Sequence, residues 1–309
     1  MDSNCQILDC TLRDGGLVND SAFTPDFAKS IVSACARAGV DIVEVGFKNS
    51  RKHFSPDKYG VYRFCDEDVV RSAKGGENVK ISVLMDVLKS DADDLLPKTD
   101  SAIDMVRCAF YFPQLDQALE LLDYAAQKDY ETAACMMAVS TLSRAQVAAA
   151  LQKMSSAKSL STIYLMDSFG ALIPPEVSEI ALEYANACAR CGKKFGVHAH
   201  NNIECAFANE LAAISCGAQI ADCTVGGLGK GAGNCPTELL VGKMRGADKS
   251  LPVIQAAQNL VEPIKKKYSC GNYSQYMLTG LLNKHPRAAM QAIAEGRNCV
   301  SEFFDIISK

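Results

Sequence analysis

The sequence predicts an α/β protein: a (β/α)₈ TIM barrel with a C-terminal helical extension. Eight short and almost continuously apolar runs alternate with longer amphipathic runs, which is typical of parallel strands buried on both faces. All eight runs lie between Gln6 and Val225, close to the roughly 250 residues of a single barrel. No linker or internal repeat separates a second domain. The structural alternative is an open, doubly wound sheet.

These runs place each element along the chain. We expect strands at Gln6–Leu12, Asp41–Gly46, Lys80–Met85, Met105–Phe110, Thr132–Val139, Thr162–Met166, Lys194–His200 and Gln219–Val225. We expect helices at Pro25–Ala38, Asp66–Ala73, Leu115–Lys128, Arg144–Ser155, Pro175–Cys191 and Ile203–Ser215, with a short helix at Asp91–Leu96 as the weakest element. Thr24 before Pro25 is a favourable start, because threonine caps helices and proline fits their first position.

The remaining chain has a helical pattern. We expect residues 1–250 to form the barrel and residues 251–309 to form a helical extension. This extension would pack on the barrel or on an oligomer partner, so a homo-oligomer is expected.

The composition excludes several classes of protein. The 309 residues carry a net charge of −4 with a pI of about 5.7, so no nucleic-acid surface is expected. No run of eighteen apolar residues and no signal peptide occur, so no membrane span is expected. Fourteen cysteines are scattered, most of them in apolar runs, which indicates reduced thiols and a cytoplasmic protein. Cys188 and Cys191 are expected to pack in a helix rather than bind zinc.

Two of the four histidines end the seventh expected strand, within Gly196–Asn202. Residues i and i+2 on a strand share a face, so His198 and His200 project in the same direction. Reactive groups of barrel enzymes sit at the carboxyl ends of strands, which places both imidazoles in the barrel mouth. Imidazoles that converge in this way are good ligands for a divalent ion. A hydrogen-bonded pair of core histidines is the alternative.

A carboxylate and a guanidinium end the first expected strand. Asp14 follows Arg13 and precedes two glycines that let the backbone turn. One neighbour separates the first and seventh strands of a closed barrel, so Asp14 can reach the same ion as the histidines. Arg13 can neutralise negative charge that develops on a substrate. A structural Arg13–Asp14 ion pair is the alternative, and Asp9 is either near the site or a buried partner for a cation.

Glu44 lies in the apolar run Ile42–Phe47. An unpaired carboxylate there would be costly, so Glu44 must be paired or functional. Arg107, in the fourth expected strand, is its expected partner. A structural network and a direct role in substrate or proton handling both stay open.

Residues 225–234 hold five glycines in ten residues. Such a loop permits close approach of a ligand to the backbone, but it lacks the Gly-Lys-Ser/Thr ending of a nucleotide-binding loop. Asn234, at its end, either caps the following helix or faces the metal site.

Together these motifs resemble the DRE-TIM metallolyase superfamily. The resemblance implies metal ligands at Asp14, His198 and His200, and Asn234 as a further ligand or a close neighbour of one. It also implies that Arg13 stabilises an enolate, and Glu44 is a second candidate catalytic residue. The implied ion is Mn²⁺ or Mg²⁺, with Zn²⁺ in some synthases, acting as a Lewis acid. The motifs occur in family order across residues 7–240, as Thr11–Gly15, Glu44–Gly46, His198–Asn201 and Gly227–Asn234.

Within this superfamily, residues 106–109 and 227–238 are most similar to the 4-hydroxy-2-oxo acid aldolases. The resemblance implies a catalytic barrel that makes or breaks a carbon–carbon bond of a 4-hydroxy-2-oxo acid through a metal-bound pyruvate enolate. Its partner would be a small pyruvate-like 2-oxo acid. The alternatives are a Claisen-type synthase, like those for isopropylmalate, citramalate and homocitrate, and a 3-hydroxy-3-methylglutaryl-CoA lyase. The synthases usually follow Arg-Asp-Gly with Glu-Gln, where this chain has Gly16 and Leu17.

The chain departs from the aldolases at one position. They place a catalytic histidine shortly after Arg-Asp-Gly, where this chain has Leu17. Tyr276 lies in the region where those aldolases carry a catalytic tyrosine, and it is the third candidate catalytic residue. His53, His285 and a metal-bound water are further candidates for proton transfer. A binding protein that has lost turnover is a third functional class.

Overall fold

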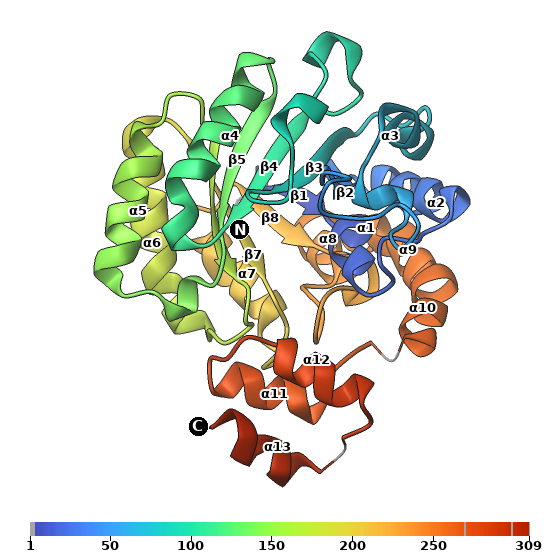
Figure 1. The fold of residues 1–309 in the computed structure, drawn as a ribbon, viewed down its shortest axis with the longest axis vertical. Helices are drawn as coiled ribbons and strands as arrows, with labels where there is room; N and C mark the ends of the chain where they lie inside the picture. Colours follow the sequence, from blue (N-terminus) through green and yellow to red (C-terminus); the bar gives the residue numbers. More distant parts are fainter. Residues whose placement is uncertain (1–3, 269, 298, 309) are drawn as a thin grey trace.

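A computed structural model describes residues 4–268, 270–297 and 299–308. Its eight parallel strands close into a barrel in chain order, with helices around them (Figure 1), so the predicted fold is confirmed. The strands are β1 (Gln6–Asp9), β2 (Ile42–Phe47), β3 (Lys80–Asp86), β4 (Met105–Phe110), β5 (Glu131–Met136), β6 (Thr162–Asp167), β7 (Lys194–Ala199) and β8 (Ile220–Cys223). The helices are α1 (Thr11–Asp14), α2 (Pro25–Arg37), α3 (Glu67–Lys74), α4 (Leu115–Gln127), α5 (Arg144–Ser156), α6 (Pro174–Cys191), α7 (Ala206–Ser215), α8 (Thr237–Arg245), α9 (Ala247–Ala256), α10 (Glu262–Lys267), α11 (Ser274–Leu281), α12 (Arg287–Ala294) and α13 (Val300–Ile307).

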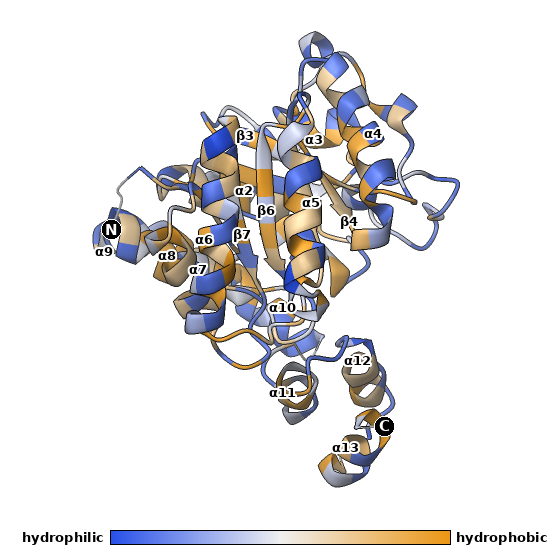
Figure 2. Ribbon diagram, turned by 90° about the vertical axis from the view of Figure 1, so that its left-hand side faces the viewer, coloured by the Kyte–Doolittle hydropathy of each residue, from blue (hydrophilic) through white to orange (hydrophobic). Residues whose placement is uncertain are grey.

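The barrel closes where β1 pairs in parallel with β8, with Leu8 opposite Asp222. Every residue of β2, β4 and β6 is buried, because helices cover the outside of the strands and side chains fill the inside. Figure 2 shows mostly hydrophobic colours on β6 and mixed colours on the helices that face solvent. The apolar runs of the sequence are therefore these buried strands.

The predicted start of α2 is also present. Oγ1 of Thr24 accepts a 3.2 Å hydrogen bond from the backbone N–H of Phe27, and Pro25 occupies the first turn. The first long helix begins at the expected residue, so local sequence signals determine the start of α2.

The first strand is shorter than predicted. It ends at Asp9 instead of Leu12, because the Asp9 carboxylate accepts hydrogen bonds from the backbone N–H and the hydroxyl of Thr11, at 3.0 and 2.9 Å. The hydroxyl of Thr237, on α8, donates to the same carboxylate at 2.6 Å. Asp9 is thus a buried hydrogen-bond acceptor that stabilises the turn into the one-turn helix α1. This helix carries Arg13 and Asp14.

Other predicted elements were also too long, among them β8, predicted at Gln219–Val225, and α7, predicted to begin at Ile203. β5 ends at Met136 instead of Val139, and Ala138 then adopts a left-handed φ of 57° that no strand continues through. The helix expected at Asp91–Leu96 is a single 3₁₀ turn over Ala92–Asp94. Local apolar pattern does not mark these ends, because side-chain hydrogen bonds and backbone turns set them.

The last three helices, α11, α12 and α13, form a separate layer over the barrel mouth, below the strands in Figure 1. Their own apolar cluster includes Tyr276 and Phe303. The amide of Asn202, in the loop after β7, donates to the carbonyl of Tyr276 at 3.4 Å and to Thr279 at 3.3 Å. This layer therefore closes over the carboxyl ends of the strands.

The boundary expected at residues 250/251 falls inside α9, which packs against α2 and α8. The helices that surround the barrel thus continue past this position, and the separate layer of helices begins with α11. Among the described helices, none is long and apolar enough to cross a membrane. The described cysteines form no disulfide bond, and the homo-oligomer stays a prediction.

Candidate metal centre

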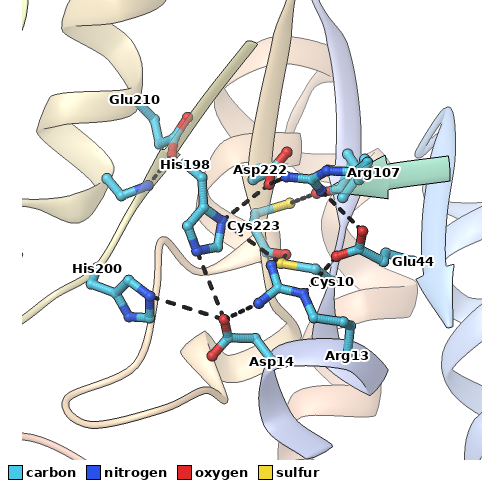
Figure 3. Close-up of polar contacts among 12 residues, drawn as sticks. Cys10, Arg13, Asp14, Glu44, Arg107, His198, His200, Glu210, Asp222 and Cys223 are labelled. Carbon is cyan, nitrogen blue, oxygen red and sulfur yellow. Dashed lines mark hydrogen bonds and ion pairs between the residues drawn. The ribbon is translucent and has the colours of Figure 1, made fainter. Parts of the chain in front are cut away.

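Asp14, His198 and His200 come together at the carboxyl-end mouth of the barrel, where both imidazoles point toward the carboxylate (Figure 3). Nε2 of His198 lies 3.8 Å, and Nε2 of His200 3.9 Å, from Oδ2 of Asp14. All three side chains are buried. First-row divalent ions bind such atoms at about 2.0–2.2 Å, so one ion can contact ligand atoms at these spacings. The side chains converge as expected, while metal binding itself stays a prediction.

The protonation states of Asp14 and His200 favour a bound cation. Burial raises the pKa of Asp14, but Arg13 and the two histidines outweigh it and hold that pKa well below its usual range. Burial lowers the pKa of His200 to about 3, although Asp14 opposes the shift. At neutral pH the group is therefore a carboxylate beside a neutral His200, which are the protonation states that ligate metals.

Asp222 orients His198. Its Oδ2 lies 3.0 Å from Nδ1 of His198 and accepts a 2.6 Å hydrogen bond from Nη2 of Arg107. Burial raises the pKa of Asp222, but Arg107 and His198 outweigh this effect and lower it. An ionised Asp222 accepts a hydrogen bond from Nδ1–H of His198 and leaves Nε2 as the ring nitrogen that can bind a cation, as in carboxylate–histidine–metal triads. Nε2 is buried and has no hydrogen-bond partner among the described residues.

Asp222 was not among the residues expected at the site. The available signal was a carboxylate inside an apolar strand, the same signal that identified Glu44. Arg107 was expected to pair with Glu44, but its closer partner is Asp222, and its Nη1 lies 3.5 Å from Oε1 of Glu44.

Arg13 bridges Asp14 and Glu44. Its Nη1 donates to Oδ2 of Asp14 at 2.5 Å and its Nε donates to Oε2 of Glu44 at 2.6 Å. Burial lowers the pKa of Arg13, but the two carboxylates outweigh it and raise the pKa above its usual value, so the guanidinium stays charged. Its Nη2 is buried without a hydrogen-bond partner among the described residues. This N–H group is available to an anionic oxygen.

Glu44 connects the two arginines of the site. One oxygen binds Arg13 and the other lies near Arg107, and the carboxylate is fully buried. Glu44 does not line the adjoining cavity. Of the two open interpretations, the arrangement favours a structural network, in which Glu44 acts on a substrate only through Arg13.

The glycine-rich loop closes over Asp14. The backbone N–H of Lys230 donates to Oδ1 of Asp14 at 2.7 Å. A Cβ atom on Gly229 would lie 2.2 Å from Nδ2 of Asn234 and 2.8 Å from Oδ1 of Asp14, so only glycine permits this approach. The loop thus packs its backbone directly against the candidate ligands.

Asn234 points into the same group. Its backbone forms a bridge with His200, and both polar atoms of its buried amide lack hydrogen-bond partners among the described residues. Of the two alternatives for Asn234, the structure excludes the helix cap, since α8 begins at Thr237 after Pro236. A buried amide without a partner is costly, and its oxygen is a ligand type that divalent ions accept.

A second cluster of ligand types is a weaker cation site. Sγ of Cys10 lies 4.0 Å from Nδ1 of His198, close to Asp222. Burial raises the pKa of the Cys10 thiol well above its usual value, which disfavours the thiolate that a metal needs. In addition, Arg107 already neutralises Asp222. The Asp14 side of His198 is the better fit for a cation.

A cavity of about 390 Å³ opens next to this centre. Arg13, Asp14, His198 and His200 line it, and Leu17 supplies an apolar wall. The donor set of two imidazoles, one carboxylate and one unpartnered amide fits a divalent cation that faces this cavity. We call it the metal cavity.

The three candidate side chains for proton transfer, His285, Tyr276 and His53, lie in different parts of the structure. His285 lines the metal cavity, whereas Tyr276 is buried in the wall of a neighbouring cavity on the other side of the glycine-rich loop. Burial raises the pKa of Tyr276 to about 12. His53 is exposed and lines neither cavity. This placement favours His285 over Tyr276 and His53 as a group that reaches a substrate.

Comparison with known proteins shows the family of the chain. The HMGL-like family model matches residues 4–262. A 4-hydroxy-2-oxovalerate aldolase of Pelotomaculum thermopropionicum is 30% identical over 267 residues, covering 85% of this chain and 77% of the relative. The enzyme of the same name from Thermus thermophilus is 28% identical, covering 84% and 75%.

Solved structures share the fold. A 3-hydroxy-3-methylglutaryl-CoA (HMG-CoA) lyase of Bacillus subtilis aligns with a TM-score of 0.68 at 20% identity, covering 89% of this chain and 97% of that one. The carboxyl transferase domain of Rhizobium etli pyruvate carboxylase aligns with a TM-score of 0.72 at 16% identity, covering 96% and 54%. At these identities the likeness concerns the barrel alone.

Proposed function

The chain belongs to the HMGL-like family, and from this premise we propose that it is a divalent-metal-dependent aldolase acting on 4-hydroxy-2-oxo acids. The relatives named 4-hydroxy-2-oxovalerate aldolase support the reaction class. The observation that carries the proposal is the placement of Arg13 beside the Asp14–His198–His200 group in one cavity. Asp14, His198, His200 and Asn234 would hold Mn²⁺ or Mg²⁺, which as a Lewis acid would polarise the carboxylate and 2-oxo oxygens of the substrate.

Cleavage breaks the bond between C3 and C4 of the substrate. The 4-hydroxyl gives its proton to solvent water and becomes the aldehyde oxygen, the electron pair of the broken bond passes to the pyruvate enolate, and C3 then takes up a proton from solvent. Arg13 directs Nη2 toward the enolate oxygen, where a charge-assisted hydrogen bond stabilises the negative charge that develops. Glu44 holds the guanidinium in this orientation through Nε.

His285 acts on the oxygen at C4 as a hydrogen-bond donor. Its Nδ1 accepts a 3.0 Å hydrogen bond from the backbone N–H of Arg287, so the neutral ring carries its proton on Nε2. Burial, together with Lys230 and Arg287, lowers the pKa of His285 to about 4. The ring therefore stays neutral at physiological pH and presents Nε2–H as a donor.

A pyruvate-release assay tests the proposal. Protein stripped of metal with a chelator is incubated with 4-hydroxy-2-oxovalerate, and pyruvate is followed with lactate dehydrogenase. Pyruvate should appear only after Mn²⁺ or Mg²⁺ is added back. The His198→Ala variant should lose at least about 100-fold in kcat/KM, because loss of a ligand exceeds the 10–100-fold effect of an outer-shell change.

Two outcomes would contradict it. Release of free thiol from an acyl-CoA and a 2-oxo acid, without pyruvate from the aldol, would indicate a condensing synthase. Metal binding that is lost in His198→Ala, with no turnover of any 4-hydroxy-2-oxo acid by the wild type, would indicate a binding protein.

A further inference from the structure

Arg63 is a buried arginine in the metal cavity that the chemistry proposed above does not use. It ends a 3₁₀ turn, Val61–Arg63, in the segment after β2. Its side chain is only 4% exposed and lines the same cavity as Arg13 and His198. A guanidinium in this place faces whatever the cavity holds.

Aromatic rings surround this guanidinium. Its Cζ lies 4.4 Å from the ring centre of Phe47 and 5.1 Å from those of Phe54 and Tyr59. These contacts fix the position of the side chain and supply cation–π attraction. No hydrogen bond joins Arg63 to any of these three side chains.

Within the described chain, the Arg63 guanidinium forms no ion pair and no hydrogen bond, and its Nε is fully buried. Burial lowers the pKa of Arg63, and Asp86, Tyr59 and Asp20 offset this only in part. The protein therefore leaves much of the desolvation cost of this charge uncompensated.

The other two buried arginines differ in this respect. Arg13 binds Glu44 and Asp14, and Arg107 binds Asp222. Both have carboxylates within hydrogen-bond distance, as buried charges usually do. Arg63 is the buried arginine of the described residues that lacks one, so its N–H groups are open to an anionic ligand.

The cavity lining as a whole is positive, although the charged groups that act most strongly on Arg63 are the carboxylates of Asp86 and Asp20. Lys89, Lys230 and Arg287 line the cavity with it, against the carboxylates of Asp20 and Asp86. Asp86 is partly neutralised, since it accepts from the amide of Asn49 at 3.3 Å and lies 3.9 Å from Lys89. An anion that enters the cavity therefore meets more cationic than anionic side chains in its lining.

We propose that Arg63 binds an anionic group, a carboxylate or a phosphate, at the far end of the aldehyde half of the substrate. This inference rests on the proposed aldolase function, in which Arg13 and the metal ligands already serve the pyruvate half. Arg63 is then a specificity-determining residue, and the natural substrate is a 4-hydroxy-2-oxo acid whose tail carries a negative charge.

The test compares three 4-hydroxy-2-oxo acids of equal chain length, with tails that end in methyl, carboxylate or phosphate. Pyruvate release is measured with Mn²⁺ for the wild type and for Arg63→Met, Arg63→Lys and Arg51→Met. Arg51 is the matched control, because its guanidinium lies 4.6 Å over the ring of Phe64 but is exposed and paired with Asp66.

The wild type should prefer one or both charged tails over the methyl tail. Arg63→Met should reduce this preference about 10- to 100-fold, mainly through KM, as expected for loss of a hydrogen bond between charged groups. Arg63→Lys should recover part of the preference, because it keeps the charge but not the planar fork. Arg51→Met should leave the preference unchanged, and the better of the two charged tails identifies the anion.

Three results would distinguish failure of the Arg63 proposal from failure of the proposed aldolase function. Equal turnover of all tails by the wild type overturns the role of Arg63 but leaves the aldolase function intact. An equal loss for charged and methyl tails in Arg63→Met assigns Arg63 a structural role only. No pyruvate from any tail removes the aldolase function, and the inference falls with it. If Arg63→Met does not fold, the wild-type preference and the Arg63→Lys variant still decide the question.

Discussion

Oδ2 of Asp222 lies 3.0 Å from Nδ1 of His198, and this contact turns the opposite nitrogen of the ring toward Asp14. β7 and β8 are neighbours in the barrel, so the barrel itself brings the two residues together. The carboxylate thereby determines which nitrogen of His198 can bind a cation, without lining the metal cavity itself.

Replacing Asp222 should weaken metal binding. Asp222→Asn keeps the shape but removes the charge that holds the Nδ1 proton, so the affinity for Mn²⁺ should fall about 10- to 100-fold. Titration calorimetry on metal-free protein measures this affinity. Asp41→Asn is the control, since Asp41 accepts a hydrogen bond from Ile7 at the opposite end of the barrel. Unchanged affinity in Asp222→Asn would show that His198 is not oriented by this contact.

Gly229 should tolerate no side chain. Gly229→Ala places a methyl group against Asn234 and Asp14, so the loop must shift away from the candidate ligands. We expect a loss of about 1–3 kcal/mol in unfolding free energy and weaker Mn²⁺ binding. Gly76→Ala, with nothing within 4 Å of the added Cβ, should change neither. If both variants bind metal like the wild type, the loop does not constrain the site.

Glu44 should matter for stability as well as for rate. Glu44→Gln leaves Arg13 and Arg107 buried with one carboxylate fewer, and removing one partner of a buried ion pair costs about 3–5 kcal/mol. Urea denaturation measures the loss. Asp66→Asn breaks the exposed pair with Arg51, which should cost at most about 1 kcal/mol. Equal costs in the two variants would argue against the buried network.

His285 should make stability depend on pH. Its folded pKa, lowered by burial and nearby cations to about 4, lies below the value near 6.5 of an unfolded histidine. The folded state therefore favours the neutral ring, whose Nδ1 accepts from Arg287 at the start of α12. This contribution is complete above about pH 6.5 and is lost as the pH falls toward 4.

The melting temperatures of the wild type and His285→Gln measure this effect. Their difference should shrink as the pH is lowered through that window. His53→Gln, at an exposed position outside the cavity, provides the baseline. A difference that stays constant between about pH 7 and 4 would contradict this contribution of His285.

Much of the fold could be predicted because the signals are local. The buried strands appear as apolar runs, and the start of α2 follows from Thr24 and Pro25. The convergence of His198 and His200 was expected from an i, i+2 spacing on one strand, although β7 ends at Ala199 and His200 follows it in a bridge with Asn234. The end of β1 could not be predicted in this way, because one hydroxyl that donates to the Asp9 carboxylate belongs to Thr237, more than two hundred residues away.

The sequence by itself determined the barrel, the candidate ligands Asp14, His198 and His200, and Arg13 beside them, because each depends on periodicity or on strand ends that any closed barrel brings to one mouth. Only the tertiary structure decided which side chains meet them there. Asp222 contacts His198 through strand pairing, and His285 rather than Tyr276 lines the cavity because of how α11 and α12 dock. Arg63 reaches the cavity from a 3₁₀ turn after β2, and its guanidinium contacts the rings of Phe47 and Phe54. Such contacts join distant segments, and no local pattern records them.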